Sequence, residues 1–489
     1  MHSPTILDGL RPELLWRFFY EISQIPRCSK REGRITAYLE EQFGRLGLKY
    51  TRDKAGNLIA QVPASRGRKG APVVVLQAHS DMVCEKNRTS SHDFERDPIR
   101  WLRQEEWMGA QGTTLGADNG IGLAAALAVA ADPQAVHGPM EILITVDEET
   151  GLNGAKGLSP KALKGRYLLN LDTEEDGVFC IGCAGGVDTN GSFVVPVEPV
   201  APAGKTALFV RIGGLKGGHS GMDIHLGRAN AIKLLARLLH ELAPLSPRIA
   251  HLQGGSKRNA IAREAEALLV VLEGQMEALH ARLAQCRQLF RGEFGTTDPD
   301  LYVSAEGAPM PERVYRSSWA TKMVRTLLAL PHGVVRMSAD IEGLVETSTN
   351  LATVIQERER LVIGTSQRSS VEGAKRHLAA SVGAVLKLAG AKVSHSDGYP
   401  GWQPNVHSPL LAISRRVAER VLGKPPRVEA IHAGLECGLI GAKYPGMDML
   451  SFGPTITGAH SPDERVHIPA VERFYELLKG ILEEISRPT

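Results

Sequence analysis

The sequence predicts an α/β fold in which a second domain interrupts the first. Short, continuous apolar runs at residues 73–76, 140–146 and 167–171 have the length and composition of buried β-strands. An alanine-rich helical pattern at about 121–131 separates the first two runs. Buried strands that alternate with helices are typical of a sheet covered by helices on both faces. The pattern changes after about residue 188 and returns near the C-terminus, which indicates an inserted domain.

The remaining elements follow from helical and alternating spacing. Two amphipathic helices are expected first, one through Leu14 to Ile22 and one over about 31–46, and a hairpin at 48–62 follows them. In the inserted region we expect strands at 207–212, 267–272, 351–355 and 360–364 and helices at 228–241, 276–290 and 372–388. Near the C-terminus we expect a helix at 410–422, strands at 428–431 and 448–452, and a helix from about 470. The predicted domain limits are 1–187, 188–398 and 399–489.

Composition excludes several classes of function. The chain has 489 residues with 57 Lys and Arg against 54 Asp and Glu, a net charge of +3 that predicts neither nucleic acid nor a membrane surface as a partner. The longest apolar run, 121–131, is shorter than the roughly 18 residues of a membrane-spanning helix. Charged residues interrupt the N-terminus, which argues against a signal peptide, and the scattered cysteines fit a reducing compartment. We therefore expect a cytoplasmic protein, and we interpret Cys180 and Cys183 as two packed cysteines.

Polar side chains follow the predicted buried strands. His79 and Asp81 come directly after the first run, Glu148 and Glu149 after the second, and Asp172 after the third. Ligands bind at the carboxyl ends of strands in such sheets, so these side chains are candidates for one site. Taken singly, each has an ordinary alternative, such as a surface histidine beside a solvated aspartate or a solvated acidic turn.

Two further segments add candidate ligands. Asp118 precedes the alanine-rich helix, where an ordinary helix N-cap is the alternative. His460 lies in a loop rich in glycine and proline. Two histidines and three carboxylates, taken together, form the ligand set of a two-metal hydrolase. Histidine and carboxylate ligands suit Zn²⁺, with Co²⁺ or Mn²⁺ as possible substitutes.

Six motifs in a fixed order carry a family resemblance. They are AHSDM at 78–82, GADNGIG at 116–122, DEETGLNGAKGL at 147–158, NLDTEEDG at 170–177, GGHSGMDI at 217–224 and GAHSPDE at 458–464. This set resembles the M20 family of metallopeptidases, and within it the bacterial aminoacyl-histidine (Xaa-His) dipeptidases. The resemblance covers essentially the whole chain. It implies a zinc-peptidase-like catalytic domain with a mixed sheet covered by helices, an inserted α+β lid domain, and a homodimer.

The resemblance also assigns roles to individual residues. Two zinc ions per subunit are implied, one held by His79 and Asp172 and the other by Glu149 and His460, with Asp118 bridging both. Glu148 is implied as the general base and Asp81 as the acidic residue behind His79. In the inserted domain, His219 is implied to stabilise the oxyanion. The implied substrate contacts are Asn259, Arg368 and Gly434.

The function implied is hydrolysis of small dipeptide substrates, preferentially Xaa-His dipeptides of the carnosine type. The nearest alternative is another M20 amidohydrolase, either a dipeptidase of broader specificity or an enzyme that acts on N-acyl amino acids. A non-catalytic binding or scaffold protein with the same fold is the alternative of a different class. The complete ligand set together with Glu148 argues against it.

Overall fold

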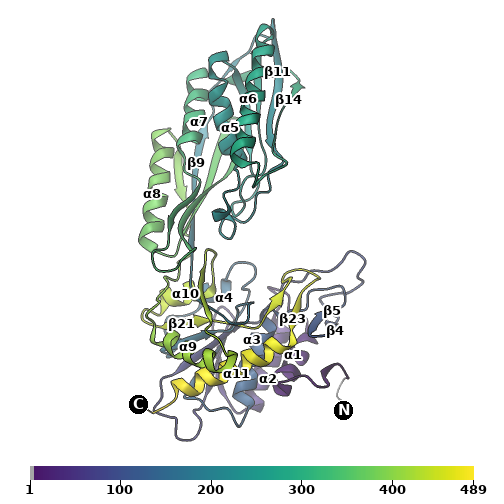
Figure 1. The fold of residues 1–489 in the computed structure, drawn as a ribbon, viewed down its shortest axis with the longest axis vertical. Helices are drawn as coiled ribbons and strands as arrows, with labels where there is room; N and C mark the ends of the chain where they lie inside the picture. The colour runs from purple at the N-terminus through teal and green to yellow at the C-terminus, as the bar shows by residue number, and fades with distance from the viewer. Residues whose placement is uncertain (1–4, 489) are drawn as a thin grey trace. The chain divides into compact units, whose positions relative to one another are not determined.

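The computed structural model describes residues 5–488, and the chain forms two compact units (Figure 1). The first unit consists of Met1–Gly182, Trp402–Ala430 and Leu435–Thr489, and the second of Cys183–Gly401 and Ile431–Gly434. The predicted domain limits at residues 187 and 398 lie near these divisions. That the two parts are independent domains with separate roles stays a prediction.

An eight-stranded mixed sheet forms the centre of the first unit. Its strand order is β1-β2-β6-β3-β7-β21-β8-β20. β3 lies in the middle and pairs in parallel with β6 and β7 on either side, and β21 continues the parallel part beyond β7. The strands are β1 (Lys49–Arg52), β2 (Leu58–Val62), β3 (Val74–His79), β6 (Met140–Thr145), β7 (Tyr167–Asn170), β8 (Val178–Cys183), β20 (Arg427–Ile431) and β21 (Asp448–Ser451). The expected α/β fold with a mixed sheet is confirmed.

The helices of the first unit pack on this sheet or on one another. They are α1 (Glu13–Ser23), α2 (Gly33–Arg45), α3 (Ala117–Ala131), α4 (Asn153–Gly157), α9 (Pro409–Leu422), α10 (Glu436–Lys443) and α11 (Ile468–Ile485). α3 precedes β6 in the chain and packs against β3 and α1, and its small side chains let it lie buried between these elements. The alanine-rich pattern therefore predicted the helix correctly, although the helix begins four residues earlier than the apolar run, at Ala117 rather than Ile121.

A smaller four-stranded sheet in the same unit was not expected from the sequence. It has the order β22-β23-β5-β4, with β4 (Trp101–Gln104), β5 (Trp107–Ala110), β22 (Ile456–Thr457) and β23 (Arg465–His467). These strands are two to four residues long, and β4 is mostly exposed, so they contain no apolar run that would reveal them. The sheet matters for function because the loop between β22 and β23 carries His460.

A disulfide joins Cys28 to Cys84 in the first unit, with the two Cα atoms 5.7 Å apart. The sequence did not predict this pair, because 56 residues separate the two cysteines and no spacing pattern links them. The disulfide departs from the expectation that the scattered cysteines are reduced. Cys180 and Cys183 both lie buried in β8, in agreement with the interpretation of packed cysteines.

The second unit is built on a nine-stranded antiparallel sheet. Its order is β14-β11-β13-β12-β17-β18-β9-β19, and β16 also pairs with β17. The strands are β9 (Gly185–Val194), β11 (Lys205–Gly213), β12 (Arg248–Gly254), β13 (Ala265–Leu272), β14 (Tyr302–Ala308), β16 (Gly333–Met337), β17 (Val345–Glu357), β18 (Arg360–Ser369) and β19 (Lys392–His395), and β10 (Val197–Pro199) and β15 (Arg313–Tyr315) form a separate pair.

Four helices cover one face of this sheet and form a single core with it (Figure 1). They are α5 (Ala231–Glu241), α6 (Met276–Phe294), α7 (Ser317–Ala329) and α8 (Glu372–Leu388). α8 has the predicted bounds, whereas β17 and β18 extend beyond the predicted runs because their polar halves carry no apolar signal. The expected α+β organisation of this region is confirmed.

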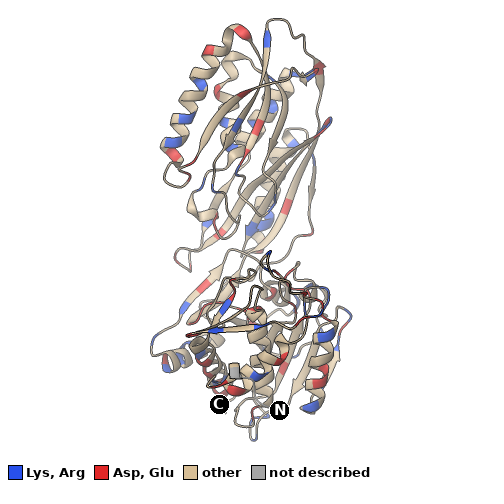
Figure 2. Ribbon diagram, turned by 90° about the vertical axis from the view of Figure 1, so that its right-hand side faces the viewer, with Lys and Arg blue, Asp and Glu red and all other residues tan. Residues whose placement is uncertain are grey.

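Charged residues of both signs are interspersed over each unit (Figure 2). This distribution agrees with the small net charge of +3. Among residues 5–488, no helix has both the length and the apolar composition needed to cross a membrane.

Gly122 provides a test of the packing that places α3 against the end of β7. A Cβ at this position would lie 2.4 Å from the carbonyl oxygen of Leu171 and 2.6 Å from Oδ1 of Asn119. We therefore expect Gly122→Ala to lower the free energy of unfolding by about 1–3 kcal/mol, the usual cost of overpacking. Gly44 in α2 has no atom within 4 Å of its Cβ position, so Gly44→Ala should stabilise the protein by about 0.5–1 kcal/mol. Urea denaturation of both variants measures the difference, and equal stabilities would contradict the packing described.

Candidate metal centre

Three adjacent parallel strands end at one edge of the first unit's large sheet, and each delivers part of the site. β3 ends at His79, with Asp81 two residues later, and the register places His79 opposite Thr145 at the end of β6. The turn after β6 carries Glu148 and Glu149, and Asp172 follows β7. The carboxyl ends of parallel strands meet at the same edge, so side chains 93 residues apart in sequence lie together.

Two triads of side chains share the carboxylate of Asp118. In the first triad, Nε2 of His79 lies 3.1 Å from Oδ1 of Asp118 and 3.4 Å from Oδ1 of Asp172. In the second, Nε2 of His460 lies 3.1 Å from Oδ2 of Asp118 and 3.0 Å from Oε1 of Glu149. Within each triad the ligand atoms all lie within 4.8 Å of one another. The structure therefore brings together all five residues expected as metal ligands.

The donor set fits metal ions. Ligand atoms about 2.0–2.2 Å from a tetrahedral zinc ion lie about 3.4 Å from each other, which is close to the separations found here. The buried oxygens Oε1 of Glu149 and Oδ1 of Asp172 face the Nε2 atoms of His460 and His79, at 3.0 and 3.4 Å. Burying several carboxylates together is costly, and cations between them would lower that cost.

The side chain of Asp118 is free for such a role because it does not cap α3. α3 follows Gly116, whose φ of +73° is left-handed, but the backbone of Asp118 and Asn119 is not helical, so the regular part of the helix begins beyond these two residues. A Cβ at Gly116 would also lie only 2.6 Å from Nη2 of Arg27, so glycine is required there. The N-cap alternative for Asp118 is thereby excluded, and both its oxygens face histidines.

Asp81 holds two parts of the site in place. It is fully buried, and Nδ1 of His79 lies 3.3 Å from its Oδ1. The same carboxylate accepts hydrogen bonds from the backbone amides of Glu148 at 3.0 Å and Glu149 at 3.2 Å, and from the hydroxyl of Ser29 at 2.7 Å. Burial opposes ionisation, but the contacts with His79 and these donors hold the pKa of Asp81 below its usual range. The alternative of a solvated aspartate beside a surface histidine is excluded.

Closely spaced carboxylates dominate the electrostatics of the site. Burial and neighbouring carboxylates, including Asp172, raise the pKa of Glu148 to about 9. Hydrogen bonds to Asp118 and Glu149 raise the pKa of His460 to about 11. Both shifts have the direction expected where several carboxylates lie close together, an arrangement that cations would stabilise.

Three buried residues around the site were not predicted. Arg27 donates to the carbonyl oxygens of Ser80 and Asp81, at 3.0 and 2.8 Å, and nothing in its surrounding sequence signalled this. Glu436 accepts hydrogen bonds from Gln77 at 2.6 Å and Thr145 at 2.7 Å, beneath the strand ends. Glu464 belongs to the sixth motif, which predicted a role only for His460, four residues earlier.

The four residues expected to contact substrate belong to the second unit. Nδ1 of His219 accepts hydrogen bonds from the amides of Gly221 and Met222, at 3.3 and 3.0 Å. Arg368 is buried, donates to the hydroxyl of Tyr399 at 2.8 Å, and has an Nε atom for which no described residue is a partner. Tyr399 also packs within 2.8 Å of the Cβ position of Gly434, whereas Asn259 is exposed.

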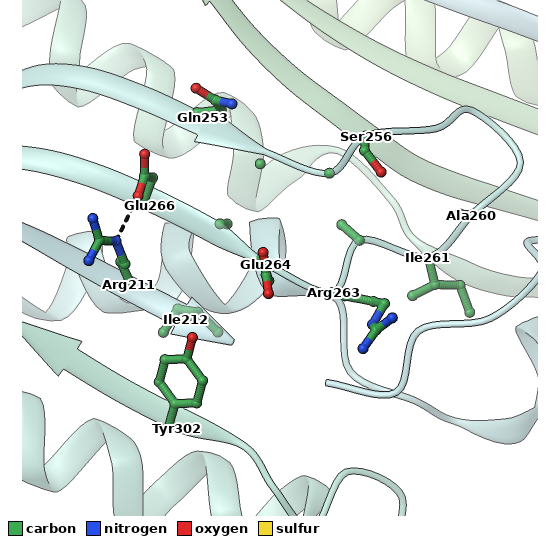
Figure 3. Close-up of a pocket in the computed structure, with 14 residues that line it drawn as sticks. Arg211, Ile212, Gln253, Ser256, Ala260, Ile261, Arg263, Glu264, Glu266 and Tyr302 are labelled. Atoms are coloured by element: carbon green, nitrogen blue, oxygen red, sulfur yellow. Dashed lines mark hydrogen bonds and ion pairs between the residues drawn. The ribbon is translucent and has the colours of Figure 1, made fainter. Parts of the chain in front are cut away.

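A separate open cavity of about 560 Å³ lies on the second unit's sheet (Figure 3). Its lining mixes charges: Arg211 on β11 forms an ion pair of 2.8 Å with Glu266 on β13, and the ring of Tyr302 lies close by. None of the five expected metal ligands lines it. This cavity is therefore not the candidate metal centre.

The sequence matches Peptidase family M20/M25/M40 over residues 75–484. This match covers most of the chain, and the chain therefore belongs to that family.

Individual relatives cover nearly the whole chain. The cytosol non-specific dipeptidase of Escherichia coli (strain K12) is 41% identical over 480 residues, 98% of this chain and 99% of the relative. The crystal structure of aminoacylhistidine dipeptidase from Vibrio alginolyticus is 41% identical, with a TM-score of 0.92 over 99% of this chain and 98% of that one. An aminopeptidase from Bacillus cereus shares the fold at 17% identity, with a TM-score of 0.57 over 98% of this chain and all of that one.

Glu148 and Glu149 are adjacent, yet we expect their removal to affect metal binding differently. Glu149 belongs to the triad of His460, so Glu149→Ala should lose about one of two zinc ions per chain. Glu148→Gln should keep both ions because the two triads remain whole. Elemental analysis after dialysis against trace zinc measures the number of zinc ions per chain. Equal metal content in the two variants would contradict the different roles of Glu148 and Glu149.

Proposed function

We propose that the chain is a metal-dependent dipeptidase that prefers Xaa-His dipeptides of the carnosine type. The observation that carries the proposal is the pair of ligand triads sharing Asp118 at the carboxyl edge of the sheet, with Glu148 beside them. Full-length similarity to two proteins named as dipeptidases supports it. One relative is named a non-specific dipeptidase and the other an aminoacylhistidine dipeptidase. A dipeptidase of broader specificity is therefore the second candidate.

The proposed ligands are the five residues of the two triads, and zinc is the proposed ion. His79 and Asp172 would hold one ion, Glu149 and His460 the other, and Asp118 both. Imidazole nitrogens and carboxylate oxygens suit Zn²⁺, and Co²⁺ or Mn²⁺ can replace it in such sites. When bound, the ions would polarise the scissile carbonyl and lower the pKa of a water molecule.

Glu148 is the proposed general base. It lies in a third cluster with His79 and Glu149, whose ligand atoms are within 4.8 Å of one another, so it faces the same space as the ligands. Asp81 fixes the backbone of Glu148 through its amide, which orients the side chain. With cations bound nearby, the carboxylate of Glu148 would be ionised; it would take a proton from water and deliver it to the leaving amine.

His219 is the proposed donor to the oxyanion. A backbone amide can only donate, so Nδ1 of His219 must be an acceptor, and the ring proton is on Nε2. Burial, and then the charge of Arg368, lower the pKa of His219, which keeps the ring neutral. A neutral ring with a proton on Nε2 is a hydrogen-bond donor for developing negative charge. His219 would have to reach the substrate from its own chain or from a second copy.

Arg368 is the proposed partner of the substrate's C-terminal carboxylate, which would favour short peptides. Its guanidinium donates to Tyr399, and its buried Nε has no partner among residues 5–488, so the group could bind an anion. Asn259 and the backbone at Gly434 are proposed to hold the peptide backbone. A homodimer and a cytoplasmic location are proposed from the family resemblance.

A substrate panel tests the proposal. Metal-free protein is reconstituted with zinc, cobalt or manganese and assayed on L-carnosine, on Cys-Gly and on N-acetyl amino acids. We expect metal-dependent hydrolysis of the dipeptides, with L-carnosine preferred. Faster turnover of Cys-Gly would favour the dipeptidase of broader specificity. Preference for N-acetyl amino acids, or full activity in strong chelator, would contradict the proposal.

His219→Ala tests the role of the second unit. Loss of one oxyanion donor typically lowers turnover by about 10²–10³-fold, so we expect kcat to fall by that factor with metal content and KM little changed. His225→Ala is the matched control, because this exposed histidine lies in the same segment. Steady-state kinetics on an Xaa-His dipeptide gives the result. A kcat of His219→Ala within threefold of the unmodified protein would exclude a role in the transition state.

A further inference from the structure

Glu464 is a buried carboxylate that belongs to neither ligand triad. Its exposed fraction is 3%, and it lies four residues after His460, just before β23. The loop that joins the two residues is compact, since the amide of Glu464 donates to the carbonyl of Ser461 at 3.0 Å and the amide of Ser461 to that of Gly458 at 3.2 Å. A constraint on Glu464 is therefore also a constraint on the backbone that carries His460.

The carboxylate of Glu464 binds four consecutive backbone amides, two in the segment just before α3 and two at its first residues. Oε2 accepts from Leu115 at 2.7 Å and Gly116 at 2.9 Å, and Oε1 accepts from Ala117 at 2.7 Å and Asp118 at 3.2 Å. The first amides of a helix have no partner within the helix, and a negative charge is favourable there. Glu464 thus replaces a local N-cap, which leaves the carboxylate of Asp118 free to face the histidines.

Arg27 holds the same loop through its carbonyl groups. Its guanidinium donates to the carbonyl oxygen of Gly116 and to those of Ser80 and Asp81, just beyond the end of β3. Arg27 is 1% exposed, so these bonds are shielded from water. With the amides bound by Glu464 and a carbonyl bound by Arg27, the peptide before Asp118 has little freedom to rotate.

We infer that Glu464 is a positioning residue for the metal centre: it ties the Asp118 backbone to the His460 loop and so sets the distance between Oδ2 of Asp118 and Nε2 of His460. This inference rests on the proposed metal-dependent function. The ligand atoms are then arranged before an ion arrives, so less conformational freedom is lost on binding. Groups that orient metal ligands typically contribute about 10–100-fold to metal affinity when tested by mutation.

Two substitutions of Glu464 separate the effect of its negative charge from the effect of its side-chain length. Glu464→Gln keeps the size of the side chain but replaces one acceptor oxygen by an NH₂ group, which cannot accept from the amides of α3. Glu464→Asp keeps both oxygens and the charge but shortens the side chain by one methylene. Asp463→Asn is the matched control, since Asp463 is the exposed neighbour on the same loop and its substitution makes the same change of charge.

The test is a zinc titration of the metal-free full chain in competition with a chromophoric chelator, with circular dichroism as a check on folding. We expect Glu464→Gln to bind its weaker zinc ion about 10–100-fold less tightly than the unmodified protein does. The zinc affinity of Glu464→Asp should lie between these two, and that of Asp463→Asn should equal that of the unmodified protein. In the Glu464 variants, hydrolysis of an Xaa-His dipeptide should recover in parallel with zinc occupancy as zinc is raised, without a change in KM. A merely structural role would lower activity independently of zinc.

Zinc dissociation constants within threefold of the unmodified protein in both Glu464 variants would overturn the inference. If Glu464→Gln does not fold, the titration of Glu464→Asp decides by the same criterion. Failure of the unmodified protein to bind zinc would contradict the proposed function instead, so the two failures are distinguishable.

Discussion

The carboxylate of Asp118 is the point on which the site depends, because two groups of ligands meet at its two oxygens. One oxygen faces His79 at the end of the central strand, and the other faces His460 on a loop more than 300 residues away in sequence. Glu148, Glu149 and Asp172 add further negative charge at the same edge. So many carboxylates lie together at low energy only if cations, or the protons that substitute for them, lie between them.

The protein around the site restrains its backbone rather than supplying that positive charge. Asp81 fixes the turn of Glu148 and Glu149 through their amides, and Glu464 fixes the start of α3 in the same manner. Arg27 is the buried cation next to these groups, but its donors are directed at carbonyl oxygens and not at the ligand carboxylates. The carboxylates of the two triads therefore remain available to ions.

The sequence predicted the parts of the fold that rest on local apolar patterns. The runs that became β3, β6 and β7 were recognisable because parallel strands buried on both faces are continuously apolar, and the side chains after each run were natural candidates. The hairpin of β4 and β5 was missed because its strands are short and partly exposed. The residues that hold the site were missed for a related reason. Arg27 and Glu464 act on backbone groups distant in sequence, and no periodicity reports such contacts.

Whether two ions share Asp118 can be seen by anomalous X-ray diffraction from crystals of the zinc-loaded chain. We expect two zinc peaks per chain, about 3.5–4 Å apart, one beside His79 and Asp172 and the other beside Glu149 and His460, with Asp118 in contact with both. A single peak, or two peaks of which Asp118 contacts only one, would contradict this expectation.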